Sequence, residues 1–118
     1  MKTFLAIYLG SLNAPGQAQW NKLEEATRQA RIASGMKAWG DWMTKHHAAI
    51  VVEGGPLGKT KRTSADGVSD TKNNMSGYVV VRAESHEAAA KMFEKHPHFT
   101  IFPGESVEIM EIMPIPGQ

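Results

Sequence analysis

Apolar residues recur along the chain with two different periods, and the change between them predicts the order of strands and helices. The apolar run at residues 3–9 is rich in Phe, Ile and Tyr, which is typical of a buried strand. From Trp20 onward, apolar residues return every three or four positions. This spacing predicts a helical region that ends near His47, with an interruption at Ser34–Gly35. Gly40 lies inside the region, where close packing would explain a glycine.

The rest of the chain alternates short strand signals with turn signals. Ile50–Val52 reads as a short buried strand that the glycines at 54–58 break, and Asp66–Gly67 is a hairpin turn signal. Ser85 is a good helix N-cap, and Pro97 disfavours helical backbone at the residue before it. Besides the strand at 50–52, we therefore expect an exposed strand at 59–65, strands at 77–82 and 107–112, a helix at 86–96 and a connection at 99–104.

This order of elements is close to the β-α-β-β-α-β plan of ferredoxin-like domains. We therefore expect one α+β domain over residues 1–118, with an antiparallel sheet that carries helices on one face. The strands are apolar on both sides, and at Met110 the alternation of the last strand slips, so that a bulge is an alternative to two covered faces. A second copy of the chain is the simplest cover for the other face, and the expected partner is therefore the chain itself, as a homodimer.

Composition narrows the class of protein without naming a function. The chain has 118 residues, 42% of them hydrophobic and 21% charged, with a formal net charge of +1. The small charge argues against a nucleic-acid partner, and no apolar run has the ~20 residues needed to span a membrane. The absence of cysteine excludes disulfides and thiolate chemistry and is compatible with a cytoplasmic location. No cofactor is indicated.

Three short motifs occur in an order that resembles a known family. Gly54-Gly55-Pro56-Leu57 follows a helix and an apolar strand, Asp70-Thr71-Lys72 precedes the strand at 77–81, and His96-Pro97 precedes residues 104–114. Together they resemble the YCII-related, or DGPF-type, proteins, over about residues 36–114. The resemblance implies a dimeric α/β barrel built from two ferredoxin-like halves, often with a pocket between sheet and helices, and it implies little about a reaction.

The chain also departs from the pattern of that family. The helix histidine that some relatives pair with an aspartate would fall near Ala38, and neither Ala38 nor Trp39 transfers protons. The Asp-Pro of the family is His96-Pro97 here, and its Asp-Gly-Pro-Phe signature is reduced to residues 65–68. The acid–base pair that the resemblance implies is therefore missing or rebuilt in this chain.

Histidines and carboxylates supply the candidates for catalysis. His96 or His47, paired with Asp70 or Asp41, would form an acid–base set, because a histidine exchanges protons near neutral pH and a carboxylate fixes its tautomer. Turn chemistry after the hairpin is the competing explanation for Asp70, and helix capping or solvation is that for Asp41. The pair His96 and His98 lacks the accompanying carboxylates of a metal site, so no metal is predicted.

Candidates for ligand binding are Trp42, Pro56, Lys72 and His98. Aromatic residues and methionines are suited to an apolar cavity, although such residues more often belong to a core or a dimer interface. Lys72 belongs to a basic group around the hairpin that would meet an anion or protect a sheet edge. Two functions follow as hypotheses: a small enzyme that uses His/Asp acid–base chemistry on a small organic ligand, or a non-catalytic, dimeric ligand-binding or accessory module.

Overall fold

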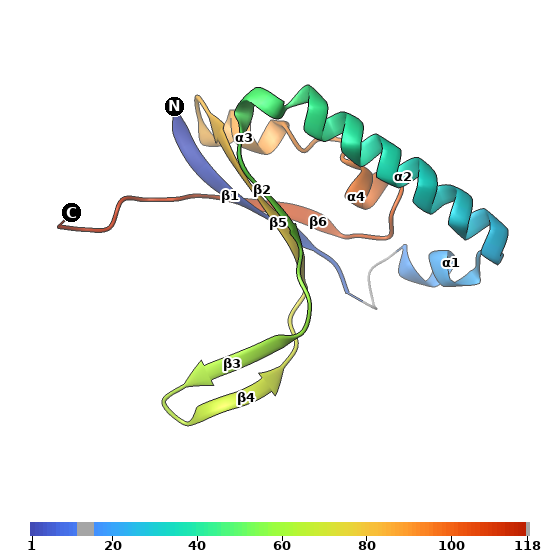
Figure 1. Cartoon of the computed structure of the whole chain (residues 1–118), viewed down its shortest axis with the longest axis horizontal. Coiled ribbons are helices and arrows are strands. Elements are labelled where there is room, and N and C mark those ends of the chain that lie inside the picture. The colour runs from blue at the N-terminus through green and yellow to red at the C-terminus, as the bar shows by residue number, and fades with distance from the viewer. Residues whose placement is uncertain (12–15, 118) are drawn as a thin grey trace.

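A computed structural model of the chain describes residues 1–11 and 16–117 and contains an antiparallel sheet with helices on one face (Figure 1). The elements in chain order are β1 (Lys2–Leu9), α1 (Gln17–Lys22), α2 (Glu25–Lys45), the short 3-10 helix η1 (His47–Ala49), β2 (Ile50–Pro56), β3 (Thr60–Ser64), β4 (Gly67–Thr71), β5 (Met75–Ala83), α3 (His86–Lys91), α4 (Pro97–Thr100) and β6 (Ser106–Glu111). In the described part of the chain, no helix is both long and apolar enough to cross a membrane.

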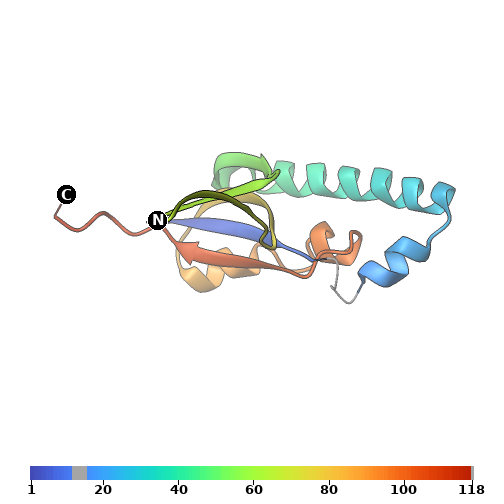
Figure 2. The same ribbon diagram turned by 90° about the horizontal axis from the view of Figure 1, so that it is seen from below.

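The main sheet has four strands in the order β2-β5-β1-β6, and every neighbouring pair is antiparallel. This is the strand order of a ferredoxin-like domain, which confirms the predicted α+β plan. Strands β3 and β4 form a separate hairpin between β2 and β5, and Figure 1 shows this hairpin projecting away from the sheet and helices. Figure 2 shows β1 in the middle of the sheet and the C-terminal tail extending beyond it.

The core lies between the sheet and the helices, and the period-2 pattern of β1 explains it. Phe4, Ala6 and Tyr8 alternate with less buried residues and are at most 4% exposed. On β5, Val79 and Val81 face the same way and are equally buried. The helical region contributes the cover through Trp42, Ala89 and Phe93. Each such large apolar side chain stabilises the fold by roughly 1.5–3 kcal/mol when fully buried.

The opposite face of the sheet is also apolar, and the described part of the chain leaves it open. Met110 and Ile112 are 44% and 49% exposed, and Val52 is 45% exposed. The pairing of β6 with β1 runs without a shift from Glu111 to Ser106, so a bulge does not explain the slipped alternation near Met110. Both faces of β6 therefore carry apolar residues.

The predicted interruption at Ser34–Gly35 is wrong, because α2 runs through it without a break. Gly35 is buried instead, and a Cβ atom there would lie 2.5 Å from the Phe102 ring, so the glycine allows the helix to pack closely on that ring. At Gly40 a Cβ atom would meet nothing within 4 Å, so close packing does not explain this glycine. The interruption lies earlier, between α1 and α2.

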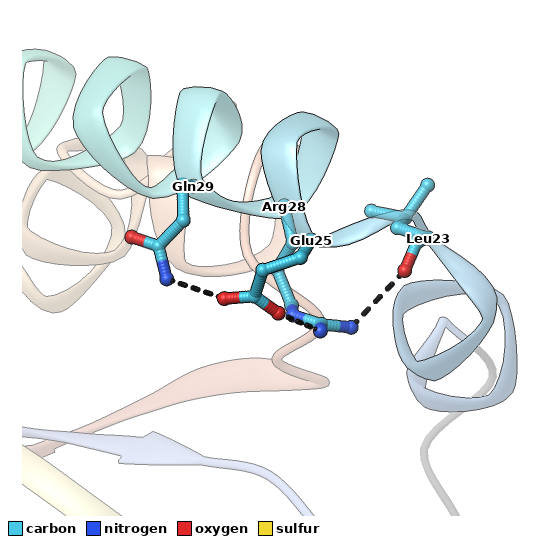
Figure 3. A network of polar contacts seen from close by, with 4 residues as sticks. All are labelled: Leu23, Glu25, Arg28 and Gln29. Atoms are coloured by element: carbon cyan, nitrogen blue, oxygen red, sulfur yellow. Dashed lines mark hydrogen bonds and ion pairs between the residues drawn. The ribbon is translucent and has the colours of Figure 1, made fainter.

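A polar network holds the turn that leads into α2 (Figure 3). Arg28 donates to the carbonyl oxygen of Leu23 at 3.2 Å and forms an ion pair with Glu25, while Gln29 donates to the other oxygen of Glu25 at 2.9 Å. The hydrogen bonds from Gln29 and Arg28 lower the pKa of Glu25. The carboxylate also lies in the first turn of the helix, where negative charge is favoured.

Strand β2 is longer than expected, because the glycines at 54 and 55 do not end it. Its pairing with β5 shifts twice, between Ile50 and Val52 and between Val52 and Gly55. Gly54 has a φ of +67° in the second shift, and a Cβ atom there would lie 2.0 Å from the carbonyl oxygen of Tyr78. Glycine therefore permits a β-bulge at this point, where any other residue would be strained.

Candidate functional site

The candidate site is built around His96, which begins the short helix α4 where the sequence predicts only a connection at 99–104. His96 is the N-cap of α4, and its Nδ1 atom accepts a hydrogen bond from the backbone N–H of His98 at 3.0 Å. Pro97 occupies the first helical position, where its fixed φ suits a helix and its missing N–H costs nothing. His96 is 0% exposed, so the same side chain both caps the helix and belongs to the core.

Aromatic rings surround the His96 imidazole. The Trp39 ring meets it edge-on at 4.5 Å between centroids, and the Trp42 ring lies at 4.9 Å. Tyr8 and Phe93 complete the group at 5.1 Å and 5.9 Å. The Trp42 indole is itself fixed, because its Nε1–H donates to the backbone carbonyl oxygen of Met92 at 2.8 Å. These contacts hold the imidazole in one orientation.

The hydrogen bonds of His96 determine its tautomer. Because Nδ1 accepts from the N–H of His98, it carries no proton, and the proton of the neutral ring is on Nε2. Nε2 lies 3.3 Å from the hydroxyl oxygen of Tyr8, so the N–H donates and the tyrosine oxygen accepts. The hydroxyl hydrogen of Tyr8 is then not used in this bond, and the other hydrogen bonds of the described residues do not use it either.

Burial sets the protonation of both partners. It is the main cause that lowers the pKa of His96 to about 4, and the charges of His98 and His46 lower it further. The ring is therefore neutral near neutral pH. Burial also raises the pKa of Tyr8, so that its hydroxyl keeps its proton. The pair acts as a chain of neutral donors that ends at the Tyr8 hydroxyl.

His98 anchors this arrangement to the end of β1. Its Nε2–H donates to the carbonyl oxygen of Leu9 at 2.7 Å, and the residue is 7% exposed. The ring fills the space beside Gly104, where a Cβ atom would come within 2.3 Å of it. The position of α4, and with it the cap at His96, is thereby tied to β1, the strand that carries Tyr8.

A cavity of about 330 Å³ lies beside the His96 group, between α2 and the strands β2 and β5. This volume is at the lower end of the range for small-molecule sites. Tyr8 and Trp39 belong both to its wall and to the surroundings of His96, which itself does not line it. The wall is formed by Tyr8, Met36, Trp39, Met43, Glu53, Gly55, Pro56, Ser76, Gly77, Tyr78, Val79 and Phe102.

The structure brings some of the predicted site residues together. His96, His98 and Trp42 form one group, and Pro56 lies in the wall of the neighbouring cavity. The sequence analysis did not select Tyr8. It is the one residue with a hydroxyl group among the alternate, buried positions of β1, and this was the signal that could have identified it.

Sequence reasoning also did not select Glu53 and Tyr78 of the cavity wall. The signal for Glu53 was one carboxylate placed directly before a Gly-Gly pair in an apolar strand. Tyr78 offered no signal beyond its place in a strand.

Other predicted residues lie elsewhere. Asp70 is on β4 in the projecting hairpin, where its carboxylate pairs with Lys61 at 2.7 Å, and both side chains are largely exposed. Lys72 follows β4 and is exposed, as is His47 in η1. The fold thus does not bring Asp70 to His96. Among residues 1–11 and 16–117, no three His, Asp or Glu side chains are placed to hold a metal ion.

Comparisons with known proteins give a fold likeness. No family model matches the chain, and no curated protein matches it. Among solved structures it is similar to 5-chloro-2-hydroxyhydroquinone dehydrochlorinase from Burkholderia phenoliruptrix AC1100, in complex with 2,5-dihydroxybenzoquinone. The TM-score is 0.55 at 20% identity, and the match covers 94% of this chain and 93% of that one. The chain therefore shares the α+β fold of that dehydrochlorinase over nearly its whole length.

Proposed function

We propose that this chain binds a small ring compound in the α2–β5 cavity and, as an enzyme, assists proton transfer on that compound through Tyr8. The observation that carries the proposal is the Tyr8 hydroxyl, which belongs to a residue of the cavity wall and is oriented by the neutral His96. The fold is similar to that of an enzyme that acts on a hydroxylated ring compound, and this similarity supports the proposal. The resemblance to the YCII-related proteins supports it as well.

The chemistry follows from the direction of the hydrogen bonds. His96 donates to Tyr8, so the Tyr8 hydroxyl is left to donate to an oxygen atom of a ligand, such as that of a phenol or quinone. A donor that is held in place before the ligand arrives stabilises negative charge that develops on that oxygen. The His96 N–H supports Tyr8 in this role, because it offsets negative charge on the tyrosine oxygen. This set replaces the His/Asp pair expected from sequence.

Binding can be tested with hydroquinone, 4-methylphenol and 2,5-dihydroxybenzoquinone as probes, followed by tryptophan fluorescence and calorimetry. We expect saturable binding, and we expect Tyr8→Phe to weaken it about five- to tenfold, as for the loss of one buried hydrogen bond. Trp20→Phe, which alters a tryptophan outside the cavity wall, is the matched control and should bind as the unaltered chain does. Equal affinity of Tyr8→Phe and the unaltered chain would contradict the proposed role of the hydroxyl.

A binding module without turnover is the second candidate, and one observation favours it. Trp39 lines the cavity and packs edge-on against His96, which is fully buried and does not itself line the cavity. A ligand there would therefore contact the Trp39 ring and not this imidazole. Exchange of ligand ring protons in D₂O, measured by NMR, separates the two candidates. Exchange that requires Tyr8 supports the enzyme, and a bound ligand that returns without exchange supports the module.

The open apolar face of the sheet supports a homodimer as part of this proposal. Met110 and Ile112 expose large apolar side chains there, next to strands whose outward residues are also apolar. A second copy would remove this surface from water, and twofold pairs are the commonest assemblies. Sedimentation at micromolar concentration should give twice the chain mass, and Met110→Lys should lower it to one chain mass. A single chain mass for the unaltered protein would rule the dimer out.

A further inference from the structure

The β-bulge in β2 determines which charged group the cavity wall offers a ligand. Val52 pairs with Val80 and Gly55 with Tyr78, so Glu53 and Gly54 together stand opposite the single residue between those partners on β5. That residue, Val79, is buried on the helix side of the sheet and lines the cavity, as Glu53 does. The positive φ of Gly54 makes this extra residue possible. The bulge thus places a carboxylate in a wall that is otherwise almost entirely apolar.

The charged and aromatic residues of the cavity wall share a preference for a positively charged ligand. Glu53 is its one ionisable carboxylate, and the described wall contains no lysine, arginine or histidine. Four aromatic residues belong to the wall, namely Tyr8, Trp39, Tyr78 and Phe102. Aromatic faces carry partial negative charge and attract cations. Glu53 itself is exposed, so a ligand cation would pair with it in contact with water. Ring faces and a carboxylate therefore favour the same ligand charge.

We propose that the cavity selects ring compounds that carry a protonated amine over those that carry a carboxylate, and that Glu53 sets this choice. The inference rests on the proposed function and adds the class of ligand. An amine on the ligand would pair with Glu53, while an oxygen of the ligand accepts from Tyr8. A ligand carboxylate would instead meet the like charge of Glu53 and find no basic partner in the described wall.

Three compounds that differ in one group test the inference: 4-hydroxybenzylamine, 4-hydroxybenzyl alcohol and 4-hydroxybenzoate. Calorimetry near neutral pH should give the tightest binding for the amine and the weakest for the carboxylate, with at least about a tenfold ratio of dissociation constants between these two. Glu53→Gln should reduce that ratio to below about threefold, since the amide keeps the size of the side chain and removes its charge. Glu94→Gln, an exposed carboxylate outside the wall, should leave the ratio unchanged.

Gly54→Ala provides a second and independent variant. Its Cβ atom would clash with the Tyr78 carbonyl oxygen, so a folded variant must reshape the bulge and should lose the same selectivity while Glu53 is retained. If this variant does not fold, Glu53→Gln still decides the matter. A ratio near one in the unaltered chain, or a ratio unaffected by Glu53→Gln, overturns the inference while ligand binding stands. Failure of all three compounds and of the phenol and quinone probes to bind overturns the proposed function itself.

Discussion

Acid should destabilise this protein through His96 by an amount that can be worked from its surroundings. The pKa of the ring falls from the ordinary value of 6.5 to about 4 on folding, chiefly because the ring is buried. Between these two values the unfolded chain binds a proton that the folded chain does not, so stability falls as the pH falls through this window. Above about pH 6.5 the ring is neutral in both states and the folded chain has its full stability. Well below about pH 4 the ring is protonated in both states, and the unfolding free energy changes no further through this group.

The size of the effect follows from the shift. One pKa unit corresponds to about 1.4 kcal/mol, so the shift of His96 corresponds to about 3 kcal/mol of unfolding free energy lost between about pH 7 and pH 4. This is a large part of the stability of a small domain, which is roughly 5–15 kcal/mol. The cap adds to the effect, because a proton on Nδ1 would also remove the bond from the His98 N–H.

Urea unfolding followed by circular dichroism at several pH values measures this quantity. His96→Gln is the informative variant, because its amide can accept from the His98 N–H and donate toward Tyr8 without titrating. The difference in unfolding free energy between the unaltered chain and this variant should shrink by about 3 kcal/mol as the pH falls. His47→Gln, at an exposed histidine, should show the pH dependence of the unaltered chain. If His96→Gln loses as much stability in acid as the unaltered chain, the buried ring is not the responsible group.

Two further predictions concern local structure and need only unfolding measurements. Gly35→Ala should lower the free energy of unfolding by roughly 1–3 kcal/mol, because its methyl group would overlap the Phe102 ring. Gly40→Ala, in open space on the same helix, should raise it by up to about 1 kcal/mol. Equal effects of the two substitutions would contradict the packing described for α2. Ser85→Ala should cost about 1 kcal/mol through loss of its 3.0 Å bond from the Ala88 N–H, and an unchanged urea midpoint would show that this cap contributes nothing.

The strands were largely predictable from sequence, because their side chains alternate in a way that depends only on local backbone geometry. The exposed hairpin at Asp66–Gly67 and the cap at Ser85 were predictable for the same reason, since each depends on residues a few positions apart. The two helix glycines were not. Gly35 and Gly40 look alike in the sequence, and only the distant Phe102 distinguishes the tightly packed one from the open one.

The candidate site shows the same limit more strongly. His96 and His98 were selected from sequence, but the partner of His96 turned out to be Tyr8, which is contributed by the opposite end of the chain. Asp70 was a reasonable partner by residue type, yet the hairpin carries it away from the core. Residue chemistry identifies candidates for a site, whereas the pairing between them depends on strand order, which single residues do not reveal.

The central place of β1 has a consequence for how the protein is made. This strand leaves the ribosome before its neighbours, β5 and β6, which lie in the last part of the chain. Until they emerge, β1 has neither of its pairing partners, and its apolar side chains are exposed. Contacts so distant in sequence slow folding, and unpaired apolar strands are prone to aggregate. We therefore expect nascent chains that lack β6 to need protection by chaperones, and Tyr8 to reach His96 only after the segment from β2 to α4 has been synthesised.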